Sequence, residues 1–144
     1  MAVPYEVDEE VEIIGTEEGL IGSYHLANVV EVLPMAGYYC IEYHLLRLPN
    51  GGPFSEIVPG GLLRPHPPFS LRSRFVIGEH VDLWSRDGWW YGTVQSNPQP
   101  GRYEINFQAF DYENVVAPAT DMRPHYHWNG IDWSVPDADL LHVD

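Results

Sequence analysis

The sequence contains no lysine, a single cysteine and no apolar run long enough to cross a bilayer. Only seven arginines oppose 21 acidic residues, which gives a formal net charge of −14. Nucleic acids and anionic membranes attract basic surfaces, so this charge argues against both and favours a cationic partner. A lone cysteine excludes an internal disulfide framework and fits a reducing compartment. The first ten residues have neither the basic start nor the apolar stretch of a signal peptide.

An apolar stripe of helical period is also missing. Thirteen glycines and thirteen prolines divide the chain into short segments in which apolar and polar residues alternate. The alternation is clearest in residues 39–43 and 103–107, where every second residue is apolar or aromatic. This pattern predicts an all-β fold of short antiparallel strands. We expect helix only as short pieces near residues 55–58 and 112–115.

The same order of segments occurs twice along the chain. Val11 corresponds to Val81, and Leu63-Arg64-Pro65-His66 corresponds to Met122-Arg123-Pro124-His125, so the offset falls from 70 to 59 residues. Each copy has about 60 residues, which is small for an independent core. We therefore predict two units, residues 5–68 and 73–135, that pack against each other. In both units, the arginine of the closing motif is expected to tie the last strand to its own unit.

The second copy carries three motifs that point to a known family. They read Phe75-Val-Ile-Gly-Glu-His-Val-Asp-Leu-Trp84, Asp87-Gly-Trp-Trp-Tyr-Gly-Thr-Val94 and Met122-Arg-Pro-His125. This set resembles the plant-type Agenet domain, a member of the Tudor-like Royal superfamily, and the first copy resembles its usual tandem partner. The resemblance covers residues 5 to about 135. It implies two bent β-barrels packed together, binding of methylated lysines on histone tails, and a nuclear protein.

The resemblance also implies where a methylated lysine would bind. A methylated ammonium prefers aromatic faces with a carboxylate nearby. Tudor-like barrels place such a cage at the end of the first strand, in the second strand, and at the turn after the third strand. In the second copy, these places predict a cage of Trp84, Trp90, Phe107, Phe110 and Asp87.

The first copy has a weaker set of residues at the same places. They are Ile14, His25, Tyr43 and Leu46. We therefore expect the methyl-lysine to bind in the second copy. The alternative for any single ring is a place in the barrel core, because strand alternation puts Trp90 on one face of its strand and both its neighbours on the other.

The peptide around the methyl-lysine is expected to lie in an acidic groove. Acidic residues are concentrated near the start of the first copy, where they favour a channel for basic side chains. The alternative is a solvated face that keeps the protein soluble. The predicted groove residues are Tyr91, Asp111, Tyr112, Glu113, His25, Tyr43, His44, Glu17 and Glu18.

Together these features predict a reader of the histone H3 tail that needs no catalytic residues, cofactor or metal. Lysine nine in its dimethylated or trimethylated form is the first expectation for the ligand, and lysine four is the second. Because seven histidines titrate near neutrality, we predict that affinity for the cationic tail rises with pH. His125 and His127 share a strand face, but no third ligand stands at metal spacing. The alternative function is a scaffold that binds proteins regardless of methylation.

Overall fold

Two sets of five strands make up most of the computed structural model, which describes residues 4–17, 20–70, 72–107 and 113–135. The first set is β1 (Glu10–Ile14), β2 (Ser23–Val32), β3 (Tyr38–Arg47), β4 (Pro53–Pro59), the single 3-10 turn η1 (Gly60–Leu62) and β5 (Leu63–Pro65). The second set is β6 (His80–Ser85), β7 (Gly88–Gln99), β8 (Arg102–Phe107), β9 (Val115–Pro118), η2 (Ala119–Asp121) and β10 (Met122–Pro124). A final hairpin is formed by β11 (His127–Trp128) and β12 (Trp133–Ser134).

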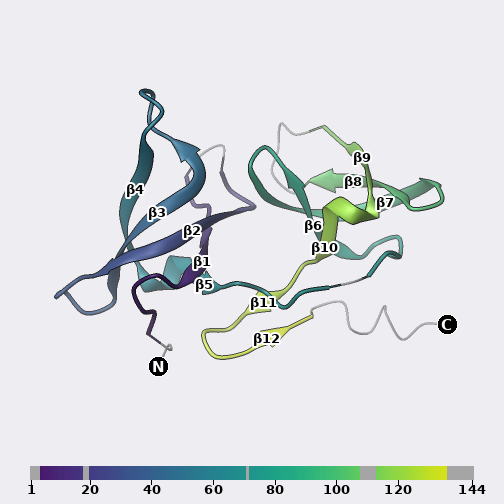
Figure 1. Cartoon of the computed structure of the whole chain (residues 1–144). Coiled ribbons are helices and arrows are strands. Elements are labelled where there is room, and N and C mark those ends of the chain that lie inside the picture. The colour runs from purple at the N-terminus through teal and green to yellow at the C-terminus, as the bar shows by residue number, and fades with distance from the viewer. Residues whose placement is uncertain (1–3, 18–19, 71, 108–112, 136–144) are drawn as a thin grey trace.

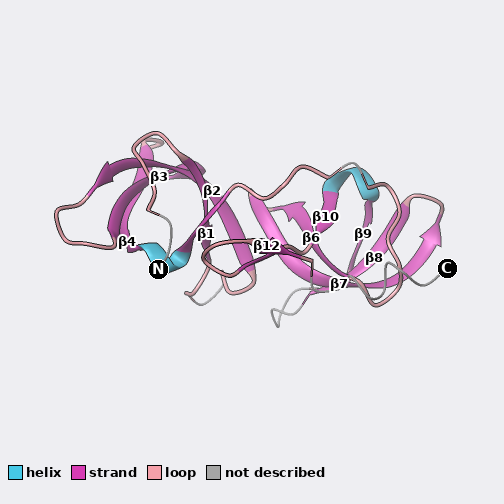
Figure 2. Ribbon diagram, turned by 90° about the horizontal axis from the view of Figure 1, so that it is seen from below, coloured by secondary structure: helices cyan, strands magenta, loops and turns pink. Residues whose placement is uncertain are grey.

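The two sets are copies of one antiparallel arrangement, as the sequence repeat predicts. In the first barrel, β1 pairs with β2 and β5, and β3 lies between β2 and β4. The second barrel repeats these pairings with β6 to β10. Figures 1 and 2 show the two barrels side by side, with the β11–β12 hairpin near the region where they meet. The predicted all-β fold of two bent Tudor-like barrels is therefore confirmed.

The expected short helices are not present in the described residues. Residues 55–58 lie inside β4, where Ile57 pairs with Cys40 of β3, and Val115 opens β9. Pairing with a neighbouring strand decides the conformation of these short segments, because local preferences are weak over four residues. Among the described residues, no helix is long and apolar enough to span a membrane.

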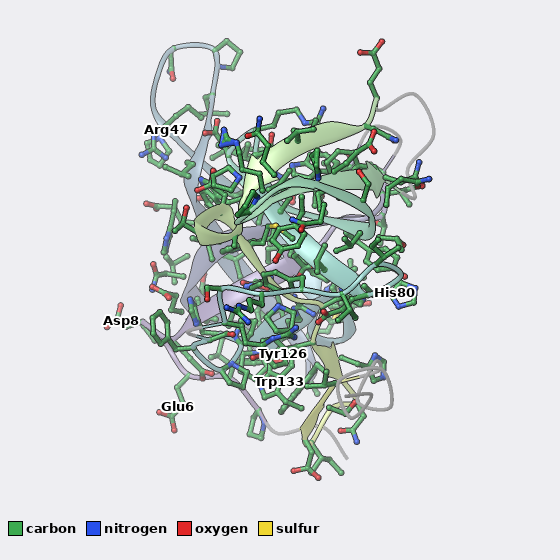
Figure 3. The ribbon with its side chains drawn as sticks, turned by 90° about the vertical axis from the view of Figure 1, so that its right-hand side faces the viewer. Glu6, Asp8, Arg47, His80, Tyr126 and Trp133 are labelled. Atoms are coloured by element: carbon green, nitrogen blue, oxygen red, sulfur yellow. The ribbon has the colours of Figure 1, made fainter. Side chains whose placement is uncertain are left out.

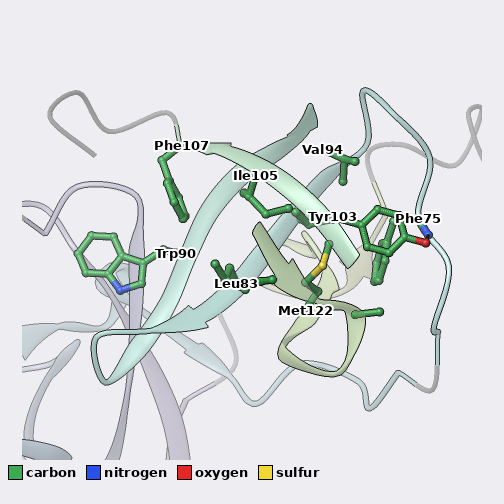
Figure 4. Close-up of a cluster of buried hydrophobic side chains, with 11 residues drawn as sticks. Phe75, Leu83, Trp90, Val94, Tyr103, Ile105, Phe107 and Met122 are labelled. Carbon is green, nitrogen blue, oxygen red and sulfur yellow. Dashed lines mark hydrogen bonds between the residues drawn. The ribbon is translucent and has the colours of Figure 1, made fainter. Parts of the chain in front are cut away.

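Each barrel encloses its own core, and the two cores use equivalent residues. In the first, the edge of Tyr5 packs against Tyr39 with ring centroids 5.5 Å apart. In the second, Phe75 packs against Tyr103 in the same way at 5.7 Å. The backbone N–H of Tyr5 donates a hydrogen bond to the Tyr39 hydroxyl, and the backbone N–H of Phe75 donates one to the Tyr103 hydroxyl. Figure 4 shows the second core, with Trp90 on the side nearest the first barrel.

The two barrels are joined by direct pairing of β2 with β7. Ser23 lies opposite Trp90 and Tyr24 lies opposite Trp89, so strands of both barrels form one continuous sheet. Tyr24 and Trp89 occupy the same position in the two copies, 65 residues apart. The pairing therefore has approximate two-fold symmetry, because the equivalent segment of the second strand of each barrel takes part in it.

A buried charge cluster lies beside this junction. Arg64 donates from Nε and Nη2 to Oε1 of Glu12, at 3.0 and 2.8 Å. Arg123 donates from Nε to Asp82 at 2.9 Å and also reaches Glu12 of the other barrel, at 2.8 and 3.0 Å. Burial disfavours the charge on Arg123, but the hydrogen bonds and charges of Glu12 and Asp82 outweigh it and raise the pKa of this arginine. The expected role of both arginines is confirmed, and Arg123 additionally ties the two barrels together.

The last hairpin covers this cluster. The backbone carbonyl of Tyr126 accepts a hydrogen bond from Nη1 of Arg64 at 3.1 Å. The Arg64 guanidinium also lies 5.1 Å from the ring centroid of Trp133, and Tyr126 and Trp133 lie together in Figure 3. A segment that follows the second barrel therefore returns to the first and shields its arginine from water.

Candidate functional site

The first barrel contains an open pocket of about 270 Å³ at the ends of β1, β3 and β4. Two of its walls are aromatic, because Tyr43 and Phe54 stack with ring centroids 5.2 Å apart and planes 9° apart. His25 stands edge-on to Tyr43 at 6.5 Å and forms a third wall. The lining residues are Ile13, Ile14, Gly15, Thr16, Glu17, Leu20, His25, Tyr43, Leu46, Phe54, Glu56, Ile57, Val58, Pro59 and Leu62.

Two carboxylates give the pocket a negative mouth. Glu56 accepts a hydrogen bond from the Tyr43 hydroxyl at 2.5 Å, while Glu17 is exposed at the rim. Burial and the nearby Glu56 carboxylate raise the pKa of Tyr43 well above its usual value, so its ring stays neutral at physiological pH. The pocket therefore combines neutral aromatic faces with negative charge, which is the environment that a desolvated organic cation prefers.

The imidazole of His25 is uncharged near neutral pH. Burial lowers the pKa of His25, and the negative charge of Asp87 in the second barrel opposes this only in part. Ser23 donates its hydroxyl proton to the carbonyl of Leu20, so its oxygen accepts from Nδ1–H of His25, 3.3 Å away. This assignment leaves Nε2 without a proton, and a cation in the pocket meets no positive charge from this ring.

The second barrel supports the same imidazole from behind. Trp90 stands edge-on to His25 with ring centroids 6.1 Å apart. A Cβ atom at Gly88 would lie only 2.9 Å from Nε2 of His25, so glycine is required for this close approach. The pocket of the first barrel is thus held in place partly by residues of the second.

The second barrel carries a different arrangement at the equivalent place. Trp90 and Phe107 are part of its core and expose only 3% and 6% of their surfaces, about as little as His25 at 4% and Tyr43 at 7% in the first barrel. The Arg86 guanidinium lies 4.7 Å from the Trp90 ring centroid and 5.7 Å from that of Phe107. Arg86 and Asp87 form the two-residue turn between β6 and β7, and both have positive φ, 50° and 63°. A cation of the protein itself therefore already contacts this aromatic pair.

Comparison with known proteins agrees with this architecture. The Agenet domain family matches residues 8–68. Over 136 residues the chain is 30% identical to the Arabidopsis thaliana protein AGENET DOMAIN (AGD)-CONTAINING P1, covering 88% of this chain and 26% of that protein. It is 27% identical over 137 residues to DUF724 domain-containing protein 6 of the same plant, covering 92% of this chain and 19% of that protein. The chain thus spans about a quarter or less of the length of these relatives.

Two solved structures share the whole two-barrel arrangement. The Arabidopsis thaliana AGDP1 AGD34 structure superposes with a TM-score of 0.83 and 29% identity, covering 90% of this chain and 88% of that one. The ADCP1 tandem Agenet domain 3-4 superposes with a TM-score of 0.79 and 27% identity, covering 90% and 86%. The chain belongs to the Agenet family. Agenet domains are non-catalytic modules, and this chain carries a tandem pair of them.

The structure of the tandem Agenet pair brings together only part of the predicted cage. Trp84 lies opposite Trp89, and Leu83 lies opposite Trp90, so Trp84 and Trp90 project from opposite faces of the β6–β7 hairpin. Trp84 instead packs edge-on against Trp89 with centroids 5.3 Å apart. Asp87 is exposed in the turn, and Phe110 lies outside the described residues.

The predicted groove residues fall into three groups. His25, Tyr43 and Glu17 line the first-barrel pocket. Tyr91 packs on His125 at 4.1 Å on the face that bears Trp89, His44 is hydrogen-bonded to Asn28, and Glu113 is exposed before β9. The remaining candidates, Glu18, Asp111 and Tyr112, lie outside the described residues.

Three residues of the site were not identified from the sequence. Phe54 and Glu56 belong to β4 and face the pocket, and Arg86 contacts the aromatic pair of the second barrel. The alternation of Phe54, Glu56 and Val58 is a strand signal that could have placed the first two on one face. No comparable signal marks Arg86, since its position depends on the backbone of a two-residue turn.

Proposed function

We propose that this tandem Agenet pair is a nuclear chromatin reader that binds a methylated lysine on the histone H3 tail. The supporting observation is the first-barrel pocket, where Tyr43, Phe54 and uncharged His25 stand beside two carboxylates. A methylated ammonium keeps its charge but is poorly hydrated, so aromatic faces and nearby carboxylates favour its transfer from water. We therefore place the methyl-lysine in this pocket rather than in the second barrel.

The carboxylates of the pocket suggest how methylation states are distinguished. Dimethyl-lysine keeps one N–H, which a carboxylate can accept, whereas trimethyl-lysine has none. Glu56 already accepts from Tyr43, so exposed Glu17 at the rim is the acceptor with more freedom. Lysine nine of histone H3, dimethylated or trimethylated, is the first candidate ligand. The extra N–H favours the dimethyl form.

Acidic residues around the first barrel suit a basic peptide. Glu6 and Asp8 are exposed ahead of β1 and project outward in Figure 3. The chain as a whole carries a formal charge of −14 and has no lysine, so its net charge attracts a positively charged tail. The same charge makes nucleic acid and anionic membranes poor partners.

A second candidate is a scaffold that binds proteins regardless of methylation. It is favoured by apolar side chains exposed on β2 and β4, notably Val32 at 47% and Ile57 at 62%. Such side chains can bury apolar area against a partner without any methylated residue. The two functions differ in whether methylation changes affinity.

Calorimetry with histone H3 peptides separates these functions. Peptides of identical sequence would carry lysine four or lysine nine in the unmethylated, monomethylated, dimethylated and trimethylated states. We expect tightest binding for dimethylated or trimethylated lysine nine and at least tenfold weaker binding for the unmethylated peptide. Equal affinity for all peptides would support the scaffold. A preference for methylated lysine four would retain the reader function and change its ligand.

A further inference from the structure

We propose that the second barrel contains a latent binding site for alkylammonium cations that its own Arg86 keeps occupied. Trp90 and Phe107 form the aromatic faces of this site, and the Arg86 guanidinium lies 4.7 and 5.7 Å from their centroids. These rings are about as buried as His25 and Tyr43 of the first barrel, so the exposed Arg86 beside them is what distinguishes this place from the open pocket. A ligand that takes the place of the guanidinium requires Arg86 to move away.

The repeat shows what the same place looks like without an arginine. Trp90 corresponds to His25 and Phe107 corresponds to Tyr43, at offsets of 65 and 64 residues. Both residues of the first barrel line the open pocket. At the offset of 70 that relates β1 to β6, Arg86 corresponds to Thr16, which is too short and uncharged to act as a resident cation.

The backbone of the turn supports a specific role for Arg86. A residue with a side chain is strained at positive φ, and two-residue hairpin turns of this kind prefer asparagine followed by glycine. Here Arg86 and Asp87 adopt φ of 50° and 63° without glycine. Such strain persists where the surrounding structure compensates for it. The contacts of the guanidinium with two aromatic faces supply that compensation.

The ligand class follows from the chemistry of the occupant. A guanidinium is planar, delocalised and weakly hydrated, so it stacks on aromatic faces. Methylated ammonium ions bind the same faces through the same attraction between cation and ring. Each barrel therefore has an aromatic site for a cation. The site of the first barrel is open, and Arg86 occupies the site of the second. This inference does not depend on the histone ligand proposed above.

The test measures binding of tetramethylammonium at the second-barrel site of the intact two-barrel protein. All variants also carry Tyr43→Ala, which weakens the first-barrel pocket, and the protein with Tyr43→Ala alone is the reference. Arg86→Gly removes the cation, and glycine suits the positive φ, so this variant is expected to fold. Arg86→Ala is the second variant. Arg102→Ala is the matched control, because Arg102 is an exposed arginine on β8 and its loss changes the net charge equally.

The readout is the indole N–H signal of Trp90 in NMR spectra, identified with Trp90→Phe, during titration at constant ionic strength with sodium chloride. We expect a saturable shift in both Arg86 variants, with affinity at least tenfold above that of the Tyr43→Ala background. The Arg102 control should match the background. Folded Arg86 variants with unchanged affinity would overturn the proposal. An equal gain in the Arg102 control would also overturn it, because net charge alone would then explain the effect.

Discussion

The two barrels share one strand order, one type of core and one closing motif, yet they differ where a ligand would enter. The first has His25, Tyr43 and Phe54 around an open pocket. The second has Trp90 and Phe107 at the equivalent places, but Arg86 lies over them. Having more aromatic residues at the expected places therefore does not make a better binding site. The difference between the barrels is the side chain beside the rings, which is Arg86 in the second barrel and Thr16 in the first.

The barrels also differ in how they use their buried acids. Glu12 accepts hydrogen bonds from Arg64 of its own barrel and from Arg123 of the other. Asp82, at the equivalent position, accepts from Arg123 and contacts His125. The first barrel therefore supplies the acid that holds the pair together, while the acid of the second serves mainly its own barrel.

The largest effect should come from removing Glu12. Glu12→Gln leaves two buried guanidinium groups with incomplete partners, and breaking a buried ion pair costs about 3–5 kcal/mol. Asp82→Asn should lower the free energy of unfolding by less, because Arg123 still donates two hydrogen bonds to Glu12. Unfolding in urea, followed by tryptophan fluorescence, measures both losses without adding salt. Equal losses in the two variants would contradict the asymmetry between the barrels.

The next largest effect concerns methyl-lysine binding. Tyr43→Ala removes one aromatic wall and should weaken binding of a methylated histone H3 peptide by about 1–3 kcal/mol, from lost cation–π attraction and lost burial. Trp84→Ala changes a ring on the outer face of the second barrel and should leave affinity unchanged. Calorimetry measures both, after circular dichroism has confirmed folding. If Trp84→Ala weakens binding more than Tyr43→Ala, the ligand lies in the second barrel.

The dependence on pH should be smaller and should originate in the first barrel. Burial lowers the pKa of His25 below the unfolded value of 6.5, so the folded protein keeps this ring neutral while the unfolded chain protonates. Stability is therefore complete above pH 6.5 and declines as the pH falls below it, whereas affinity for a cation declines only when the pH falls through the lowered pKa of the folded ring. We expect nearly constant peptide affinity from pH 8 to pH 6.5 and weaker binding as the pH falls toward 5.

His25→Gln should flatten this profile. Glu17 and Glu56, which line the pocket, and Asp87 of the second barrel are unchanged in that variant, so the comparison isolates the imidazole. A profile that keeps its slope in His25→Gln would exclude His25 as the source of the pH dependence.

The smallest effect should come from Glu17. This carboxylate is exposed, and exposed ion pairs contribute about 0.2–1 kcal/mol, so Glu17→Gln should weaken peptide binding by about fivefold at most. Salt screens such attraction over about 10 Å at 0.1 M, so the difference from the unmodified chain should vanish at high ionic strength for a trimethylated peptide. For a dimethylated peptide, part of the difference should remain, because its N–H can donate to Glu17. Calorimetry with both peptides at two salt concentrations measures this. A difference that vanishes for both peptides would exclude the hydrogen bond to Glu17.

The sequence predicts the fold well because the governing signals are periodic or repeated. Alternation in residues 39–43 and 103–107 places the core side of two strands, and the repeat identifies Arg64 and Arg123 as equivalent ties. The site is harder to predict because it depends on turns. The two-residue turn at Arg86 fixes which rings of β6 and β7 face inward, and neither composition nor spacing reveals its backbone conformation.

Because β2 pairs with β7, the two barrels together are the smallest part of this chain that we expect to fold independently. If the two barrels were produced as separate proteins, divided within residues 69–74, β2 and β7 would each have unpaired backbone groups at an exposed edge. The division would also separate Glu12 from Arg123. Open edges recruit strands from other molecules, so each half on its own would tend to aggregate. Gene duplication and recombination in this lineage should therefore be tolerated at the borders of the pair and selected against at its middle.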